Sequence, residues 1–171
     1  MTPVLMTERL LLRAHRRDDF PAMTALWSDP DVVRHIRPPS TTEECWHRLL
    51  RYRGLWDVLG FGYWAVEERE TGAFLGDVGL ADLARPGLGE LEGAAEAGWV
   101  LSPTTRGRGI GDEAVGAMLA WADAQPGLPP IVAMIAPENG PSLRLAARHG
   151  FRFVRAAKHG GPVHLFDRPG T

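Results

Sequence analysis

Cysteine is almost missing from this sequence of 171 residues, since Cys45 is its only one. One cysteine excludes a disulfide framework and a metal site built on several thiolates. The six histidines follow no H-E-x-x-H or other ligand spacing, so we expect no metal. No neighbour in the sequence lowers the pKa of the Cys45 thiol, which favours a small buried residue over a nucleophile. We expect a protein of the reducing cytoplasm.

Long apolar runs and lysine are also scarce. No stretch approaches the roughly 18 uninterrupted apolar residues of a membrane span, and Glu8 and Arg9 interrupt the opening segment. Lysine and arginine together number 19, of which Lys158 is the only lysine, and the formal net charge is -2. This balance disfavours a nucleic-acid duplex as ligand, although arginines can still form local anion sites. We expect neither a membrane nor a nucleic-acid partner.

The order of periodic segments predicts one α+β domain over residues 1–171. Residues 7–13 indicate a strand, residues 17–28 a helix that Pro30 ends, and residues 31–36 a connecting piece. Thr41 and Glu44 form a capping box that opens a second helix, for which we expect the core residues Cys45, Leu49 and Leu50.

The second half of the chain predicts the rest of a mixed sheet. Strands at 62–67 and 73–80 flank a turn at 70–72, and a strand at 95–101 precedes a helix at 110–124. The apolar run 131–135 after that helix implies a right-handed crossover and a locally parallel strand pair. A helix at 141–149 and strands at 151–156 and 162–167 complete about six to seven strands and about four helices.

A glycine-rich turn lies between the strand at 95–101 and the helix at 110–124. Its residues are Arg106, Gly107, Arg108, Gly109, Ile110 and Gly111. Glycine permits positive φ and close approach of a ligand, and the unpaired amides of a helix N-terminus attract anions. Asp112 stands where a dinucleotide fingerprint needs its third glycine, and Walker A needs a lysine. Six residues alone leave open a solvated turn.

The Arg-x-x-Gly-x-Gly turn resembles the pyrophosphate turn of the GNAT superfamily of acyl-CoA-dependent N-acetyltransferases. Asn139-Gly140-Pro141-Ser142, with Gly150-Phe151 after the helix, is similar to the second cofactor motif of that superfamily. The opening Thr-Glu-Arg-Leu-x-Leu-Arg at 7–13 and the segment 29–32 resemble the ribosomal-protein N-terminal acetyltransferases of the RimJ/RimL type.

The resemblance implies acetyl-CoA as co-substrate and a GNAT-like fold in which the strands at 98–101 and 131–135 splay apart around it. Main-chain groups of Val100, Leu101 and Ser102 would pair with the pantetheine arm. Asn139 and Ser142 would open the helix beside that arm, while residues 106–111 hold the pyrophosphate.

The remaining chemistry is removal of a proton from the amine, for which Glu96 is our first candidate. Glu96 lies on the strand beside the expected thioester, where a carboxylate can accept a proton directly or through water. The alternative is a polar strand residue that faces solvent or an arginine. Asp77 and Glu67 are weaker candidates on neighbouring strands.

The leaving thiolate has no obvious acid. Many family members carry a tyrosine seven residues after the asparagine, and this chain has Ala146 there. Ser142 is a candidate partner of the sulfur, although it could instead cap its helix. Likewise, His149 suits the dipole at the end of that helix.

The acceptor side is less informative. His35, Trp27 and Trp46 lie in or near the first two helices and could contact substrate or belong to the core. We expect an enzyme that acetylates a primary amine by direct attack on the thioester. The sequence favours an amine of low pKa such as a peptide N-terminus, and leaves open a small-molecule acceptor, a non-catalytic CoA-binding module, and a homodimer.

Overall fold

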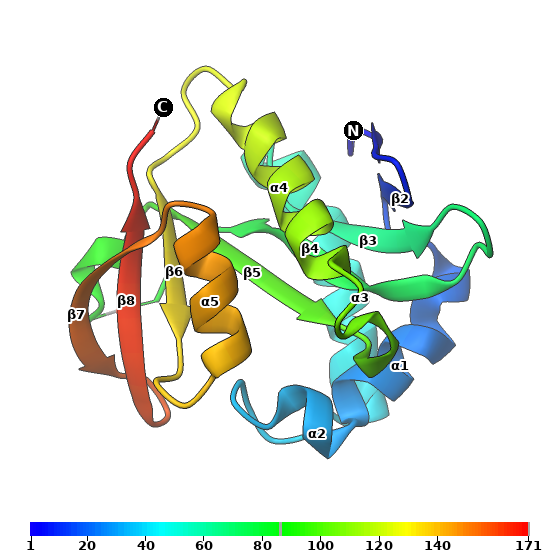
Figure 1. Cartoon of the computed structure of the whole chain (residues 1–171), viewed down its shortest axis with the longest axis horizontal. Coiled ribbons are helices and arrows are strands. Elements are labelled where there is room, and N and C mark those ends of the chain that lie inside the picture. Colours follow the sequence, from blue (N-terminus) through cyan, green and yellow to red (C-terminus); the bar gives the residue numbers. More distant parts are fainter. Residues whose placement is uncertain (86, 171) are drawn as a thin grey trace.

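The computed structural model describes residues 1–85 and 87–170, whose strands and helices form a layered α+β fold (Figure 1). Eight strands share one mixed sheet with the order β1-β2-β3-β4-β5-β6-β8-β7. The α+β class is confirmed, with one strand more than the predicted upper number. The strands are β1 (Leu5–Met6), β2 (Leu10–Arg13), β3 (Tyr63–Glu68), β4 (Phe74–Ala81), β5 (Ala95–Leu101), β6 (Ile131–Ile135), β7 (Arg152–Lys158) and β8 (Pro162–Arg168).

Five α-helices lie on the two faces of the sheet. They are α1 (Phe20–Ser28), α2 (Pro30–Val33), α3 (Thr42–Leu59), α4 (Ile110–Asp123) and α5 (Gly140–Arg148). Short 3-10 turns occur at η1 (Arg17–Asp19), η2 (Gly89–Leu91) and η3 (Pro103–Thr105). Helices α4 and α5 lie in front of the sheet and α3 lies behind it in Figure 1. None of these helices combines the length and the apolar composition that a membrane crossing requires.

Each face of the sheet has its own buried core. Val115, Met118 and Leu119 of α4 pack on one face against Trp64 and neighbouring strand residues, as the helical spacing predicts. The other face packs against α1 and α3 through a second cluster that includes Met23, Leu49 and Val100. The sheet therefore separates a face covered by α4 and α5 from a face covered by α1 and α3.

Helix α3 begins where its capping box predicts. Thr41 N–H donates to Glu44 Oε2 at 2.8 Å, and Glu44 N–H donates to Thr41 Oγ1 at 3.2 Å. Cys45 and Leu49 are buried as predicted, and burial raises the pKa of the Cys45 thiol. The prediction for Leu50 is wrong, because its side chain is 49% exposed. Leu50 lies one position beyond the buried stripe, on the solvent side of the helix.

The segment after α1 differs from the predicted connecting piece. Residues Pro30–Val33 form the one-turn helix α2. The Asp29 side chain accepts a hydrogen bond from Asp31 N–H at 2.8 Å, and Pro30 occupies the first helical position, where its missing N–H costs nothing. The proline that ends α1 therefore also begins α2.

A buried ion pair fixes the start of α1 against the sheet. Arg13 of β2 binds Asp19 through two hydrogen bonds of 2.8 and 2.7 Å, and its Nε donates to Glu67 Oε2 at 2.6 Å. Burial alone would raise the pKa of Asp19, but hydrogen bonds from Arg13 and from Arg16 N–H outweigh burial and lower that pKa. The ionised carboxylate is therefore the form that the fold stabilises.

We predict that Asp19→Ala lowers the free energy of unfolding by about 3 kcal/mol at pH 7, because it leaves Arg13 buried with one partner fewer. Asp31→Ala is the control, since it removes an exposed ion pair with Arg34 and should change little. Because the folded pKa of Asp19 is lowered, its stabilisation is complete above the ordinary value of about 4 and disappears as pH falls below it. Urea denaturation from pH 3 to 7 measures the free energy of unfolding of each variant and its dependence on pH. An equal loss of stability in Asp19→Ala and Asp31→Ala would contradict a stabilising role of the buried ion pair.

Candidate functional site

A gap between the parallel strands β5 and β6 is the main irregularity of the sheet. The two strands pair only at Ala95 with Ile131 and at Glu96 with Val132. Beyond these residues the described chain contains no further pairing between them, although β5 continues to Leu101 and β6 to Ile135. The predicted splay is therefore present, and it begins after Val132.

The main chain of β5 directs alternate groups into this gap. Ala95 N–H donates to Pro130 O at 2.9 Å on the β6 side, and Ser102 N–H donates to Leu75 O at 2.7 Å on the β4 side. Because main-chain groups alternate between the two edges of a strand, Trp99 and Leu101 face the gap. Of the residues 100–102 that we expect to pair with the pantetheine arm, Leu101 is therefore the best placed. The N–H of Ser102 is already bound, and the main chain of Val100 faces β4.

The glycine turn lies directly after the gap and before α4. Gly107 and Gly109 have φ values of 72° and 73°, and Gly109 is the residue that precedes the helix. Within the described residues, the N–H groups of Gly107, Gly109, Ile110 and Gly111 have no acceptor. A β-carbon at Gly107 would meet no atom within 4 Å, so the turn is open to a ligand. The amides and the helix N-terminus together provide an anion site.

The two arginines of the turn differ in their partners. Arg106 is exposed, and no ion pair holds it in the described part of the chain, so it is available to an anion. Arg108 instead pairs with Glu68 of β3, which lowers the pKa of that carboxyl through their hydrogen bond. Arg106 is therefore the better placed of the two to meet a phosphate.

The opening sequence motif, residues 7–13, fixes the position of the glycine turn through hydrogen bonds. Arg9 donates from Nη1 to Arg108 O at 2.6 Å and from Nε to Glu113 Oε2 at 2.6 Å. Glu113 of α4 also accepts from Thr7 Oγ1 and from Arg9 N–H. Burial would raise the pKa of Glu113, but these hydrogen bonds lower it. The motif at residues 7–13 therefore fixes the first turn of α4 and the carbonyl of Arg108.

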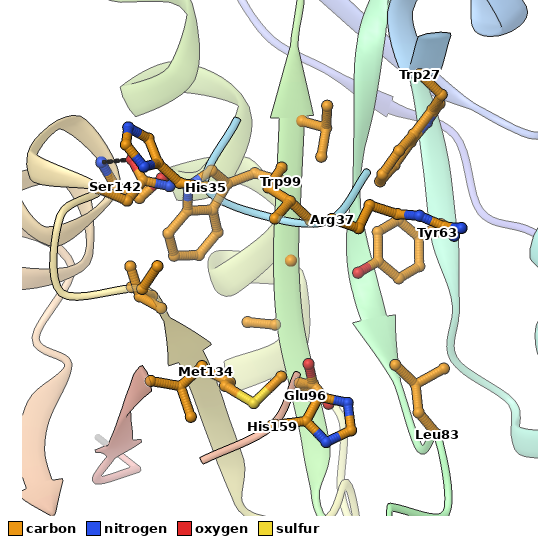
Figure 2. A pocket seen from close by; sticks show the side chains of 18 of the residues that line it. Trp27, His35, Arg37, Tyr63, Leu83, Glu96, Trp99, Met134, Ser142 and His159 are labelled. Atoms are coloured by element: carbon orange, nitrogen blue, oxygen red, sulfur yellow. Dashed lines mark hydrogen bonds between the residues drawn. The ribbon is translucent and has the colours of Figure 1, made fainter. Parts of the chain in front are cut away.

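Asn139 and Ser142 lie across the gap at the start of α5. Asn139 Oδ1 accepts from Ser142 N–H at 3.3 Å, so Asn139 caps the helix and Ser142 does not. The indole Nε1 of Trp99 donates to Ser142 Oγ at 3.1 Å. Because Ser142 Oγ accepts there, its own hydrogen remains free to donate. Figure 2 shows Ser142 and Trp99 on the same side of the pocket.

Two other residues of α5 have structural positions. Ala146 is fully buried in the core and does not line the pocket, so a phenol at this position would have to displace core side chains. His149 follows the last residue of α5, and its ring lies 3.2 Å from Asp112 of α4.

A cavity of about 550 Å³ joins the gap to the face covered by α1 and α3. Residues 96–100 of β5, the end of β6, Asn139 and Ser142 line one side. Trp27, His35 and residues of α3 line the other, whereas Trp46 is not among the lining residues and packs on Phe20. The cavity therefore extends from the gap to α1 and α3, and its volume is large enough for an acceptor.

Glu96 lies on the cavity wall in an ion pair. Its carboxylate accepts from Arg85 Nε at 2.7 Å and from Arg85 Nη2 at 3.2 Å. Arg85 Nη1 lies 2.7 Å from His159 Nε2. A carboxylate has more acceptor positions than these two bonds occupy, so Glu96 can still receive a proton or a water.

The weaker carboxylate candidates do not reach the cavity. Glu67 binds Arg13, and Asp77 is fully buried below the cavity wall. Asp77 accepts from Trp27 Nε1 at 2.7 Å and lies 2.6 Å from His15 Nε2. Asp77 therefore holds the indole of Trp27, which lines the cavity, and is a positioning residue. Among the described residues, no group of three or more histidine, cysteine or carboxylate side chains could hold a metal ion.

Tyr63 is a cavity residue that the sequence reasoning missed. It pairs with Gly79 in β4, and Gly79 pairs with Gly98 in β5. A β-carbon at Gly98 would lie 2.1 Å from Tyr63 Oη, and one at Gly79 would lie 2.5 Å from Tyr63 Cγ. The phenol therefore crosses two glycines and points towards β5 (Figure 2). The signal in the sequence was this pair of glycines at one register position.

The environment of Tyr63 keeps its hydroxyl protonated. Burial, and after it the negative charge of Glu96, raise the pKa of Tyr63 well above its usual range. The ring stacks on Tyr52 of α3 with centroids 4.2 Å apart, which fixes its orientation. A protonated phenol held in this way is a hydrogen-bond donor at the point where β5 leaves β6.

Comparison with known proteins agrees with this geometry. A family model described as "Acetyltransferase (GNAT) domain" matches residues 9–152. The uncharacterized N-acetyltransferase YoaA of Bacillus subtilis is 26% identical over 154 residues, which are 89% of this chain and 84% of that protein. The crystal structure of an acetyltransferase from Agrobacterium tumefaciens str. C58 superposes with a TM-score of 0.84 at 28% identity, over 99% of this chain and 95% of that one.

A structure of RimL, a ribosomal L7/L12 α-N-protein acetyltransferase in complex with coenzyme A, shares the fold. Its TM-score is 0.79 at 18% identity, and the match covers 97% of both chains. Since the family model spans most of the sequence and named acetyltransferases share both sequence and fold with it, the chain belongs to the GNAT family of N-acetyltransferases.

Proposed function

We propose that this protein transfers an acetyl group from acetyl-CoA to a primary amine, and that its residues 1–171 act as one domain. The observation that carries the proposal is the gap that opens beside β5 immediately before the unpaired amides of the glycine turn. A pyrophosphate matches those amides, and an extended arm matches the unpaired main chain of Trp99 and Leu101. The residues present therefore fit coenzyme A.

Acetyl-CoA supplies the activated acyl group as a thioester. In our proposal the main chain of β5 and the Asn139 end of α5 orient it, while the amine enters from the α1 and α3 side of the cavity. The amine nitrogen bonds to the carbonyl carbon, the carbon–sulfur bond breaks, and the thiolate leaves. Glu96 takes the proton that the nitrogen loses, directly or through a water. The free hydrogen of Ser142 stabilises the thiolate.

Tyr63 is the second donor in the proposed mechanism. Its hydroxyl lies against Gly98, on the strand that we expect to hold the thioester. A donor fixed before the reaction stabilises the oxygen that becomes negative as the nitrogen attacks. Tyr63 therefore acts on the carbonyl oxygen, which is a different role from that of the phenol missing at Ala146.

The acceptor that we propose is a peptide or protein N-terminus. An α-amino group has a pKa of about 8, so a useful fraction is unprotonated at neutral pH, whereas lysine at about 10.4 is almost wholly protonated. Glu96, the proposed base, already accepts two hydrogen bonds from Arg85, so an amine that is partly unprotonated at neutral pH suits this site. The fold shared with RimL, whose own substrate is a ribosomal protein N-terminus, supports this choice.

We predict that Gly109→Val weakens acetyl-CoA binding at least about tenfold, or about 1.4 kcal/mol, because a branched side chain would cover the amides of the turn. Gly109 has φ 73°, so part of any loss of stability is backbone strain. Gly72→Val is the matched control, since Gly72 has φ 71° in the β3–β4 turn with open space around it. Titration calorimetry on both folded variants measures the difference; unchanged affinity in Gly109→Val would refute the pyrophosphate site.

We predict that Tyr63→Phe lowers kcat about 10²-fold, the effect of removing one preorganised donor, and leaves acetyl-CoA affinity unchanged. Tyr52→Phe is the control, because Tyr52 stacks on Tyr63 but its hydroxyl does not lie over Gly98. Initial rates of thiol release and calorimetry separate catalysis from binding. If both variants retain the wild-type kcat, Tyr63 only packs against the glycines.

A further inference from the structure

Arg48 of α3 is a buried cation that no carboxylate of the described residues contacts. The residue is 4% exposed and lines the cavity. Its Nη1 donates to the hydroxyl of Ser40 at 3.1 Å, and its guanidinium carbon lies 3.6 Å from the ring centroid of Trp27. Its Nε is buried and has no hydrogen-bond partner within the described chain. The two groups that contact the Arg48 guanidinium directly, the Ser40 hydroxyl and the Trp27 ring, are therefore neutral.

Two further arginines stand beside Arg48 at the same wall. Arg37 and Arg51 line the cavity, and desolvation together with these positive charges lowers the pKa of Arg48. Arg37 pairs with Glu44, whereas Arg51 is exposed and has no carboxylate partner in the described residues. We call Arg37, Arg48 and Arg51 the arginine cluster. The acidic side chain that lines the cavity, Glu96, is already bound to Arg85.

Such an arrangement is unfavourable unless an anion completes it. Removal of a charge from water costs more free energy than a contact with an aromatic face and one neutral hydrogen bond return. Like charges nearby add to the cost. Arg48 and Arg51 both line the cavity and Arg51 is exposed, so their guanidinium groups leave donors for a planar bidentate anion, which such groups bind well.

We propose that the acceptor amine carries a carboxylate close to the amino group, and that the arginine cluster recognises this carboxylate through Arg48. The inference rests on the proposed function and specifies the substrate class of the same cavity. The expected acceptors are peptides with an acidic residue next to the N-terminus or free α-amino acids. A polyamine or an aminoglycoside would bring more positive charge to the cluster and is a poor acceptor.

The cluster also assists the reaction itself. A positive environment disfavours the protonated amine, so it lowers the pKa of the acceptor amino group. The carboxylate that binds to Arg48 would thereby place its neighbouring amine where less of it is charged. The arginine cluster would then both select the acceptor and favour the unprotonated form of its amine.

The test compares acceptors that carry either a carboxylate or a neutral amide near the amine, with kcat/KM expressed for the unprotonated amine in each case. The first pair is Ala-Glu-amide and Ala-Gln-amide; the second is free alanine and alaninamide. We expect wild-type kcat/KM to favour the acidic member of at least one pair about tenfold or more, mainly through KM, and the favoured pair identifies the source of the carboxylate. Arg48→Gln should reduce that preference to near unity without changing acetyl-CoA affinity, and Arg48→Lys should retain part of it.

Two further variants show whether the preference depends on the arginine cluster. Arg51→Gln changes an exposed side chain and should lower the preference without risk to folding, whereas Arg53→Gln removes an equal charge from α3 outside the cavity and should not. Binding of N-acetylated Ala-Glu-amide, followed by calorimetry, reports on the cluster independently of turnover. Absence of turnover with intact binding would refute the proposed function alone. Equal kcat/KM within both pairs, or an unchanged preference in Arg48→Gln and Arg51→Gln, would overturn the anion site.

Discussion

The loss of pairing between β5 and β6 is the constraint on which the site depends. Two residue pairs hold the strands together, and beyond them the described strands pair with β5 on its β4 edge alone. Main-chain groups without a partner are costly inside a protein, so this edge needs a ligand with its own donors and acceptors. The same strand leads into the glycine turn, where further amides are unpaired. The interrupted pairing between β5 and β6 thus leaves a continuous row of unpaired main-chain groups that runs from β5 to the glycine turn.

The face of β5 that is turned towards α1 and α3 provides the rest of the candidate site. Gly98 has no side chain, and the phenol of Tyr63 reaches across the space that this leaves. Glu96 lies one position along the same face, bound to Arg85, and Asp77 fixes the indole of Trp27 below. The cavity wall is thus a set of polar groups that neighbouring elements hold in place. Such preorganisation is the property that transition-state stabilisation requires.

Much of the fold followed from local signals in the sequence. The capping box of α3, the turn around Gly72 and the apolar run of β6 each depend on a few adjacent residues, and each element was found near its predicted bounds. The two-residue strand β1 and the single turn α2 are too short to leave a periodic pattern. Local physics therefore predicted the long elements and missed the short ones.

The site was predictable only where its motifs are contiguous. The glycine turn and Asn139 could be read directly, but Tyr63 needs the register of three strands, and the ion pair of Glu96 needs a loop that returns Arg85 to β5. Arg48 likewise reads as an ordinary charged residue of α3, because its burial depends on Trp27 and Ser40. Long-range contacts decide these roles, and a single sequence does not display them.

The most direct test of the central claim is release of free thiol from acetyl-CoA in the presence of a primary amine. The account predicts thiol release that depends on both protein and amine, with one acetylated amine found by mass spectrometry for each thiol. Binding of acetyl-CoA without thiol release above the protein-free rate, across peptide, amino-acid and polyamine acceptors, would contradict it and indicate a binding module on the same fold.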